Sequence, residues 1–219
     1  MAERVAARLR KAILAGELAP GDFIRQEKWA ATLGVSRLPV REALKMLTTE
    51  GLLGHDPNRG YYLVKLDVEE MAQIYLMRRL LEPELIKTIR WPTTKEMSQL
   101  RETAKKAEKA LENGDPVACL SLERIIDYQI YDLSRLKIVA REVKRLWELV
   151  DPYRSLVFAE PSSFYGTDSG TDSAYGLHAR HTRIFDALEA RDRDALAKAV
   201  FTNFDHMLGY FQRRPFLAD

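Results

Sequence analysis

The sequence predicts a mainly α-helical protein, with an N-terminal winged helix-turn-helix of three helices and a β-hairpin wing, followed by an all-helical bundle of about six helices. Three observations predict this fold. Apolar residues recur at helical spacing along most of the chain, while strand signals are confined to residues 52–64. In addition, the excess of Lys and Arg over Asp and Glu lies in the first 65 residues. We therefore expect two domains, at residues 1–66 and 67–219.

The three N-terminal helices are predicted from apolar spacing and from the residues that begin and end them. The first covers residues 3–15 and ends at Gly16, and the second covers residues 26–33 and ends at Gly34. The third begins after Ser36, a favourable N-cap, with Pro39 in its first turn, where the missing N–H costs nothing. It ends near residue 51. A hairpin is predicted over residues 52–64, with its turn at residues 56–60.

After residue 66 the strand signals end and long amphipathic segments follow. The first opens with a capping-box pattern at Asp67 and Glu70. Turn and stop residues then divide the remainder. The predicted helices cover roughly residues 68–90, 94–112, 116–134, 137–157, 174–190 and 193–213.

The composition limits the classes of protein to consider. A hydrophobic share of 46% with 30% charged residues is ordinary for a globular protein. No apolar run has the length of a membrane span, and the N-terminus lacks the pattern of a secretory signal. Cys119 is the only cysteine, which excludes an internal disulfide and a cysteine-based zinc site. We expect a cytoplasmic protein that does not bind membranes.

A cationic face on the third helix points to DNA. Arg37, Arg41 and Lys45 follow one another at intervals of four residues, so they share one face, while the apolar residues occupy another. A basic face of this kind can also be exposed to solvent without binding a partner. However, the order of helix, short helix, capped basic helix and Gly-tipped hairpin favours a helix whose N-terminus enters the major groove. Arg59 and Gly60 at the wing tip would then reach a neighbouring groove or the backbone.

The segment APGDFIRQEKWAATLGVSRLPVREALKMLTTEGLL resembles the winged helix-turn-helix of the GntR family of bacterial repressors, and GVSRLPVREAL matches the family's strongest signature. One departure is Trp29, where the family usually has Leu. The resemblance implies a homodimer bound to a short palindromic operator of double-stranded DNA. The predicted DNA-binding residues are Arg25, Ser36, Arg37, Pro39, Arg41, Lys45, Arg59 and Gly60.

Several polar residues of the second domain lie where the helical pattern predicts core. Arg78 falls inside the apolar stripe of its helix, and His181 and Asn203 do so in two later helices. Glu123 and Asp127, four residues apart, would repel unless a cation or a proton lies between them. Each residue alone could be a satisfied core group or a solvated one. Together they suggest a polar cavity, because unpaired burial costs about 1–3 kcal/mol for a neutral group. The predicted effector-binding residues are Arg78, Glu123, Asp127, His181 and Asn203.

The helical region resembles the FadR-like ligand-binding domain of GntR regulators, called FCD, over most of residues 67–213, and six helices resemble its shorter VanR-type branch. Many such domains hold a metal through one Asp and three His and sense organic acids. The matching positions here are Glu123, Asp127, His181 and Asn203, so only one histidine survives. An oxygen-rich set favours calcium, magnesium or manganese over zinc or nickel. The cofactor therefore stays open between one divalent metal ion and none. His178 or His206 could substitute as a ligand.

The resemblance implies a transcriptional regulator, a repressor, whose operator affinity is controlled by a small effector such as a carboxylate. Arg78 would pair with the effector's carboxylate or with Glu123 and Asp127. An enzyme is the rival class, but the sequence has no nucleophile motif, no HExxH and no phosphate-binding glycine loop. A purely architectural DNA-binding protein is a third reading, and the inward polar residues argue against it. We expect no enzymatic activity.

Overall fold

The computed structural model describes residues 1–158 and 173–201. Their helices and strands form two compact units. The first contains Met1–Leu66 together with Trp147–Leu156, and the second contains Asp67–Leu146 and the later helices. Within the described residues, no helix is long and apolar enough to cross a membrane. Asn203 and His206, which the sequence suggested as ligands, lie outside the described residues.

The first unit has the predicted three helices, α1 (Ala2–Leu14), α2 (Gln26–Leu33) and α3 (Arg37–Thr49). Helices α1 and α3 pack together, and their apolar faces supply most of a single core. Leu9 of α1 and Leu44 of α3 are fully buried in this core. The turn between α2 and α3 depends on Gly34, whose φ of +63° lies in the left-handed region that other residues avoid. The core thus fixes the outward face of α3.

The wing is a three-stranded antiparallel sheet in the order β1-β3-β2. Strands β2 (Leu53–Asp56) and β3 (Gly60–Leu63) form the predicted hairpin, and β1 (Phe23–Ile24) pairs with β3. The sequence did not predict β1, because two residues are too few to show an alternating pattern. At the wing tip the Asp56 carboxylate accepts hydrogen bonds from the backbone N–H groups of Asn58 and Arg59. These bonds fix the turn that presents Arg59.

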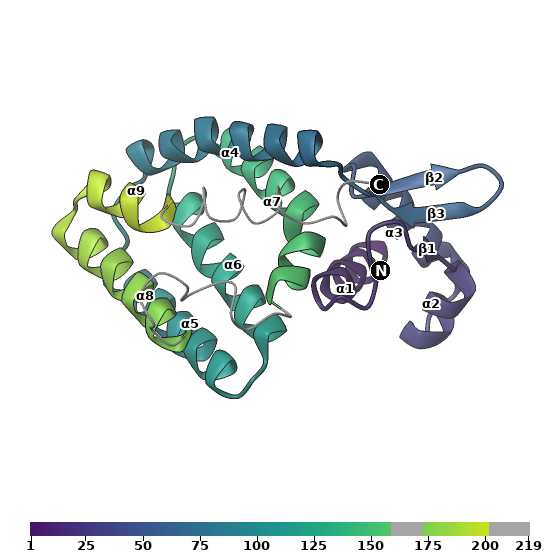
Figure 1. Ribbon diagram of the computed structural model, residues 1–219, viewed down its shortest axis with the longest axis horizontal. Helices are drawn as coiled ribbons and strands as arrows, with labels where there is room; N and C mark the ends of the chain where they lie inside the picture. Colours follow the sequence, from purple (N-terminus) through teal and green to yellow (C-terminus); the bar gives the residue numbers. More distant parts are fainter. Residues whose placement is uncertain (159–172, 202–219) are drawn as a thin grey trace. The chain divides into compact units, whose positions relative to one another are not determined.

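The described part of the second unit is entirely helical apart from one isolated bridge. Its helices are α4 (Val68–Thr88), α5 (Thr94–Glu112), α6 (Pro116–Asp132), α7 (Lys137–Phe158), α8 (Ser173–Ala190) and α9 (Arg193–Phe201), and α7 also extends into the first unit. The capping box that the sequence predicted at Asp67 and Glu70 is formed, and a second one begins α5. Helix α5 packs between α6 and α8, while α4 contacts α6 and α9 (Figure 1).

Candidate functional sites

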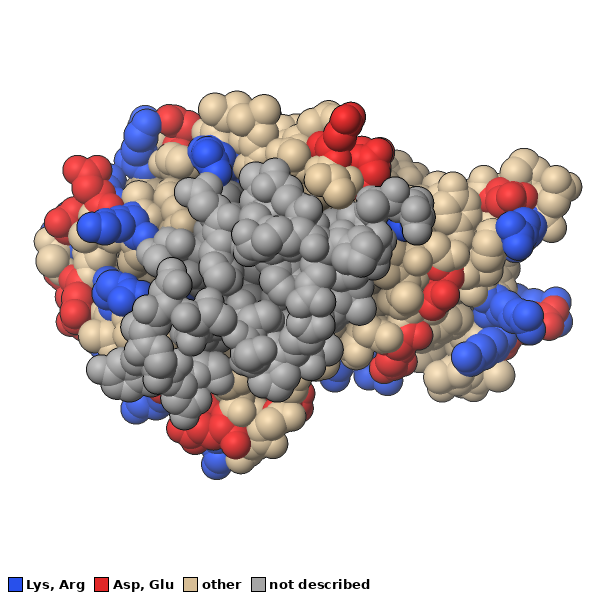
Figure 2. Space-filling view, viewed as in Figure 1, with Lys and Arg blue, Asp and Glu red and all other residues tan. Residues whose placement is uncertain are grey.

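One hollow in the first unit brings together cationic residues from three separate elements. It has a volume of about 620 Å³ and is lined by Arg25 before α2, Arg37 at the start of α3, and Arg59 and Gly60 at the wing, together with Phe23, Ile24, Gln26, Glu27 and Tyr61. Figure 2 shows blue side chains at the end of this unit that carries α2 and the wing, with red ones among them. Four of the eight predicted DNA-binding residues therefore line a common surface.

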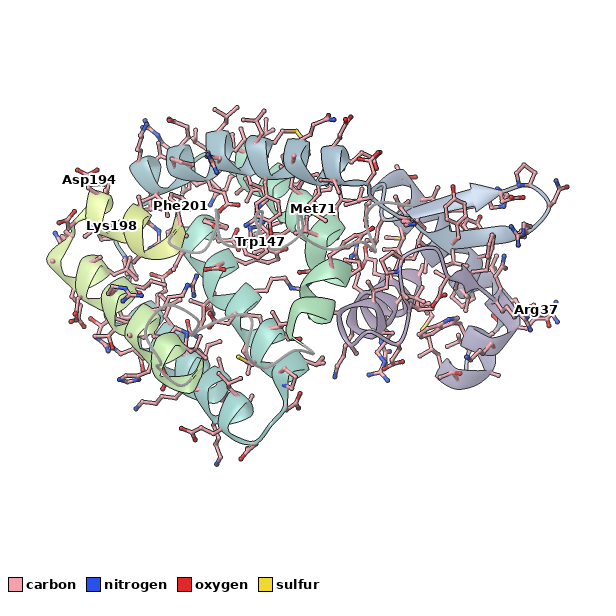
Figure 3. The ribbon with its side chains drawn as sticks, in the orientation of Figure 1. Arg37, Met71, Trp147, Asp194, Lys198 and Phe201 are labelled. Atoms are coloured by element: carbon pink, nitrogen blue, oxygen red, sulfur yellow. The ribbon has the colours of Figure 1, made fainter. Side chains whose placement is uncertain are left out.

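Arg37 is held at this surface by its place at the start of α3. Ser36 takes the N-cap position, although its side chain makes no capping hydrogen bond within the described part of the chain. The Arg37 side chain is directed outward (Figure 3) and lies 3.0 Å from Glu27 of α2. Both side chains are more than 70% exposed, so this ion pair is weak and easily exchanged.

The remaining cations of the first unit extend this surface along α3 and onto the wing. Arg41 and Lys45 are exposed on α3, and both lie near Glu42, at 3.6 and 3.5 Å. On the wing, the guanidinium of Arg59 lies 4.7 Å from the centre of the Phe23 ring. This cation–π contact orients Arg59 without using its hydrogen-bond donors. Surfaces with mobile arginine and lysine side chains around a helix N-terminus are suited to phosphates and base edges.

The second unit contains a buried polar cluster that joins α4, α5, α6 and α8. Arg78 on α4 is 2% exposed, and its Nε donates a hydrogen bond of 2.7 Å to Glu82, one turn further along the same helix. The hydroxyl of Tyr131 on α6 donates to the other oxygen of Glu82 at 2.5 Å. Burial raises the pKa of Glu82, although Arg78 and Tyr131 act in the opposite direction. The structure thus gives Arg78 a partner that the sequence reasoning did not consider.

Arg180 on α8 supplies the cation between the two neighbouring carboxylates of α6. Its Nη1 donates to Glu123 Oε2 and its Nη2 donates to Asp127 Oδ1, each at 2.8 Å. All three residues are at most 7% exposed. In a poorly solvated site, a fork of two charge-assisted hydrogen bonds fixes the positions of both carboxylates.

His181, the next residue, lies between two further carboxylate contacts. Its Nε2 is 2.6 Å from Glu123 Oε1, and its Nδ1 is 2.7 Å from Glu108 on α5. Burial lowers the pKa of His181, but the hydrogen bonds to Glu123 and Glu108 outweigh burial, so the net pKa is raised. With a carboxylate oxygen near each ring nitrogen, this geometry favours the protonated imidazole, in which both nitrogens donate. His178 also contacts Glu108, at 3.2 Å, but its side chain is 66% exposed.

These residues do not fit the divalent metal that the resemblance implies. Among the described residues, no group of three or more His, Cys, Asp and Glu side chains is arranged to hold a metal ion. Both oxygens of Glu123 and both nitrogens of His181 already have protein partners. A metal ligand must offer a lone pair, so a metal ion bound here would have to displace these partners. Of the predicted ligands, Glu123, Asp127 and His181 come together around Arg180, and Asn203 lies outside the described residues.

Sequence reasoning missed Glu82, Glu108, Tyr131 and Arg180, although signals for two of them were present. Glu82 lies four residues after Arg78, the spacing of a helical ion pair. Arg180 lies three residues after Leu177 and four before Ile184, so it falls in the same apolar stripe as His181. The contacts of Glu108 and Tyr131 depend on how neighbouring helices are aligned, which the sequence of one helix does not contain.

The cluster offers two chemical features for recognising a small molecule. It contains the guanidinium groups of Arg78 and Arg180, which match carboxylate geometry. It also contains the carboxylates that now neutralise them, which a ligand's carboxylate could replace. Because the groups come from different helices, such an exchange would alter helix packing.

Comparison with known proteins matches both units. The model of "Bacterial regulatory proteins, gntR family" matches residues 1–63, and the model of the "FCD domain" matches residues 73–206. The chain is 26% identical to the uncharacterized HTH-type transcriptional regulator YdhC of Bacillus subtilis, over 90% of this chain and 85% of that protein. It is 28% identical to the gluconate operon transcriptional repressor of the same organism, over 92% of this chain and 81% of that repressor.

The fold also matches a solved structure. The structure of Escherichia coli McbR/YncC aligns with a TM-score of 0.78 at 19% sequence identity, covering 97% of each chain. The relatives named here are transcriptional regulators, which agrees with a binding protein rather than an enzyme. The chain belongs to the GntR family of bacterial transcriptional regulators and carries the family's FCD effector-binding domain.

Proposed function

We propose that this regulator is a homodimeric repressor that binds a short palindromic operator and leaves it when an organic acid binds the FCD domain. The observation that carries the proposal is the convergence of Arg25, Arg37 and Arg59, from three separate elements, on one hollow of the first unit. Such a convergence is expected of a surface that binds a polyanion, because phosphate contacts require clustered cations.

In this proposal the start of α3 enters the major groove and the wing contacts the adjacent backbone. Ser36, Arg37, Arg41 and Lys45 face the DNA from α3, and Pro39 sets the first turn. Leu38 is 58% exposed beside Arg37, where its apolar side chain can contact a thymine methyl group. Glu27 leaves Arg37 for solvent when a phosphate or base takes its place.

The proposed effector site is the buried polar cluster of Arg78, Glu123, Asp127, Arg180 and His181. A carboxylate effector would take a guanidinium from one of the protein's own acids, and the released helix would change its packing. The relative named a gluconate operon transcriptional repressor supports sugar acids as the first class to examine. Binding to one arrangement of the helices more tightly than to the other is what couples the effector to DNA affinity.

The proposal also includes the branch of the FCD group and the cellular location. The described part of the FCD domain has six helices, which supports the VanR-type branch. Since an operator on chromosomal DNA is the proposed target, the protein would act in the cytoplasm.

The experiment has two stages. First, duplexes that bind the full-length protein are selected from a random DNA library and sequenced, and two half-sites related by a two-fold axis are expected. Second, sugar acids and other organic acids are added to the selected complex, and release of fluorescently labelled DNA is measured by anisotropy. Selection of sequences without symmetry would contradict a homodimer on a palindrome, and failure of every acid to release DNA would contradict a carboxylate effector.

A further inference from the structure

The position of Arg180 has a consequence for metal binding. Its guanidinium lies 2.8 Å from Glu123 and 2.8 Å from Asp127, which are one helical turn apart on α6. The same Glu123 contacts His181 through its other oxygen. Glu123, Asp127 and His181 are three of the four positions at which the family resemblance places metal ligands. A divalent ion bound at these positions would therefore have to share the carboxylates of Glu123 and Asp127 with Arg180.

A guanidinium and a divalent cation exclude one another at this place. Arg180 has no lone pair to donate, and its delocalised positive charge would repel a metal ion bound to the same two carboxylates. The side chains of Arg180, Glu123 and Asp127 are at most 9% exposed, so water screens the repulsion between the guanidinium and a metal ion poorly. The site can hold one cation or the other.

We propose that Arg180 is a built-in cation that takes the place of the metal, so that this FCD domain folds without a metal ion. When Arg180 is removed, Glu123, Asp127 and His181 become a binding site for a divalent metal. Two carboxylates and one imidazole favour manganese, and zinc, which prefers imidazole ligands, serves as the comparison ion. The proposal concerns metal binding alone, so it stands or fails independently of the DNA and effector experiments above.

The test measures binding of Mn²⁺ and Zn²⁺ by isothermal titration and by thermal melting, after dialysis of tag-free protein against a chelator. Wild-type protein is expected to bind neither ion at this site and to melt at the same temperature with and without them. Arg180→Ala is expected to melt at a lower temperature without metal, to bind one ion per chain, and to recover part of the lost melting temperature when metal is added. Arg183→Ala, an exposed arginine on the same helix, is the matched control and should behave as wild type.

The double variant Arg180→Ala/Asp127→Ala should lose the new metal binding. Stoichiometric metal in wild-type protein that disappears in Asp127→Asn would overturn the proposal, as would a folded Arg180→Ala that binds neither ion. If Arg180→Ala folds only when metal is present, the proposal is supported. If it does not fold at all, the wild-type titration decides the question.

A second, independent observation concerns the outer face of α4. Leu76, Met77 and Leu80 are 55%, 39% and 64% exposed, which is unusual for neighbouring large apolar residues. At 3.6 residues per turn, positions 69, 76, 80 and 87 fall within an arc of about 40° on the side opposite the buried Arg78. In Figure 2 the surface over the middle of α4 is largely tan.

The α4 stripe, formed by Glu69, Leu76, Leu80 and Lys87, is symmetric about residue 78. Glu69 lies nine residues before the midpoint and Lys87 nine residues after it, while Leu76 and Leu80 flank it at two residues. If two copies of α4 pack antiparallel across a two-fold axis, Leu76 meets the partner's Leu80 and Glu69 meets the partner's Lys87. Charge complementarity of this kind arises only in the antiparallel arrangement, because a parallel pair would place like charges together.

We infer that this α4 stripe is the surface on which a second copy of the chain docks, with the two helices antiparallel. The inference rests on the homodimer proposed above and names its contact. In sedimentation experiments the wild type should be a dimer, and Leu76→Glu/Leu80→Glu should be a monomer that keeps its helical content. Ile138→Glu, which changes a 74% exposed apolar residue of α7, is the control and should stay dimeric.

Orientation is tested by the double variant Glu69→Cys/Lys87→Cys. The two positions are 18 residues apart on one helix, about 27 Å, so they cannot join within one chain. Oxidation should give covalent dimers in which peptide mapping finds residue 69 linked to residue 87. Linkages of 69 to 69 would overturn the antiparallel arrangement, and a dimer that survives Leu76→Glu/Leu80→Glu would overturn the surface. A monomeric wild type would instead contradict the homodimer itself.

Discussion

Arg180 on α8 donates a hydrogen bond of 2.8 Å to Asp127 on α6, and the two residues are 7% and 3% exposed. Removing the Asp127 carboxylate deprives Nη2 of the buried Arg180 of this partner while Nη1 keeps Glu123, and breaking a buried ion pair typically costs about 3–5 kcal/mol. We therefore expect Asp127→Ala to lower the free energy of unfolding in urea by about 3–5 kcal/mol. The control is Asp132→Asn, which breaks an exposed pair with Lys144 and should cost about 0–1 kcal/mol. Equal costs for the two variants would show that the buried pair contributes little.

Stability should depend on pH through His181. Its pKa in the folded protein is raised, so the folded state binds the proton more tightly than the unfolded chain. The stabilisation is fully present below the unfolded value of about 6.5 and is lost as the pH rises through the folded value. The groups that face the imidazole are Glu108, Glu123 and Arg180.

The measurement is urea unfolding of wild type and His181→Gln between acidic and alkaline pH. The difference in unfolding free energy between the two proteins should be largest at low pH and should shrink as the pH rises. A difference that stays constant or grows with pH would mean that His181 is not held as a cation.

Arg37 should contribute directly to DNA binding. It stands at the N-terminus of α3 and lines the hollow shared with Arg25 and Arg59. Arg37→Ala is expected to weaken binding to the selected operator by about 1–3 kcal/mol if it contacts a base edge, and to lower the salt slope by about 1 if it contacts a phosphate. Anisotropy titrations at several salt concentrations distinguish these cases. Arg8→Ala, an exposed arginine of α1 that does not line the hollow, should leave affinity unchanged, and an equal loss in both variants would point to net charge alone.

Glu27 should oppose DNA binding. Its carboxylate lies 3.0 Å from Arg37 and lines the same hollow, so it must be repelled by an approaching phosphate. Glu27→Gln is expected to tighten binding to random duplex DNA several-fold at low salt, with a smaller gain as salt increases. The matched control is Glu17→Gln, an exposed carboxylate of the same unit outside the hollow. Weaker binding by Glu27→Gln would instead assign Glu27 a positioning role for Arg37.

The sequence predicted the helices well because their signals are local. Helix α2 covers residues 26–33, as expected, since Gly34 ends it with a positive φ. The capping residues Asp67 and Glu70 likewise form the predicted hydrogen bonds. In contrast, β1 is held by pairing with β3, which is nearly forty residues away, and its two residues have no pattern of their own.

The candidate sites were predicted in part. Periodicity identified Arg78 and His181 as inward-facing, while Glu123 and Asp127 were singled out as a carboxylate pair at the edge of an apolar stripe, and all four are at most 3% exposed. It did not identify which side chains they meet, because contacts between α6 and α8 depend on helix packing. The repulsion expected between Glu123 and Asp127 was a correct indication that a cation lies there. That this cation is Arg180 follows only from the structure.

Control of DNA affinity by an acid bound in the FCD domain is tested most directly by one titration. Labelled operator is titrated with wild-type protein, Arg78→Lys and Arg79→Lys, each with and without the acid that most effectively releases DNA. Wild type and the exposed Arg79→Lys control should lose operator affinity by about 5–150-fold when the acid is present, the usual range of such coupling. Arg78→Lys should bind the operator normally but respond less. An operator affinity that no acid changes in wild-type protein would contradict the proposed control.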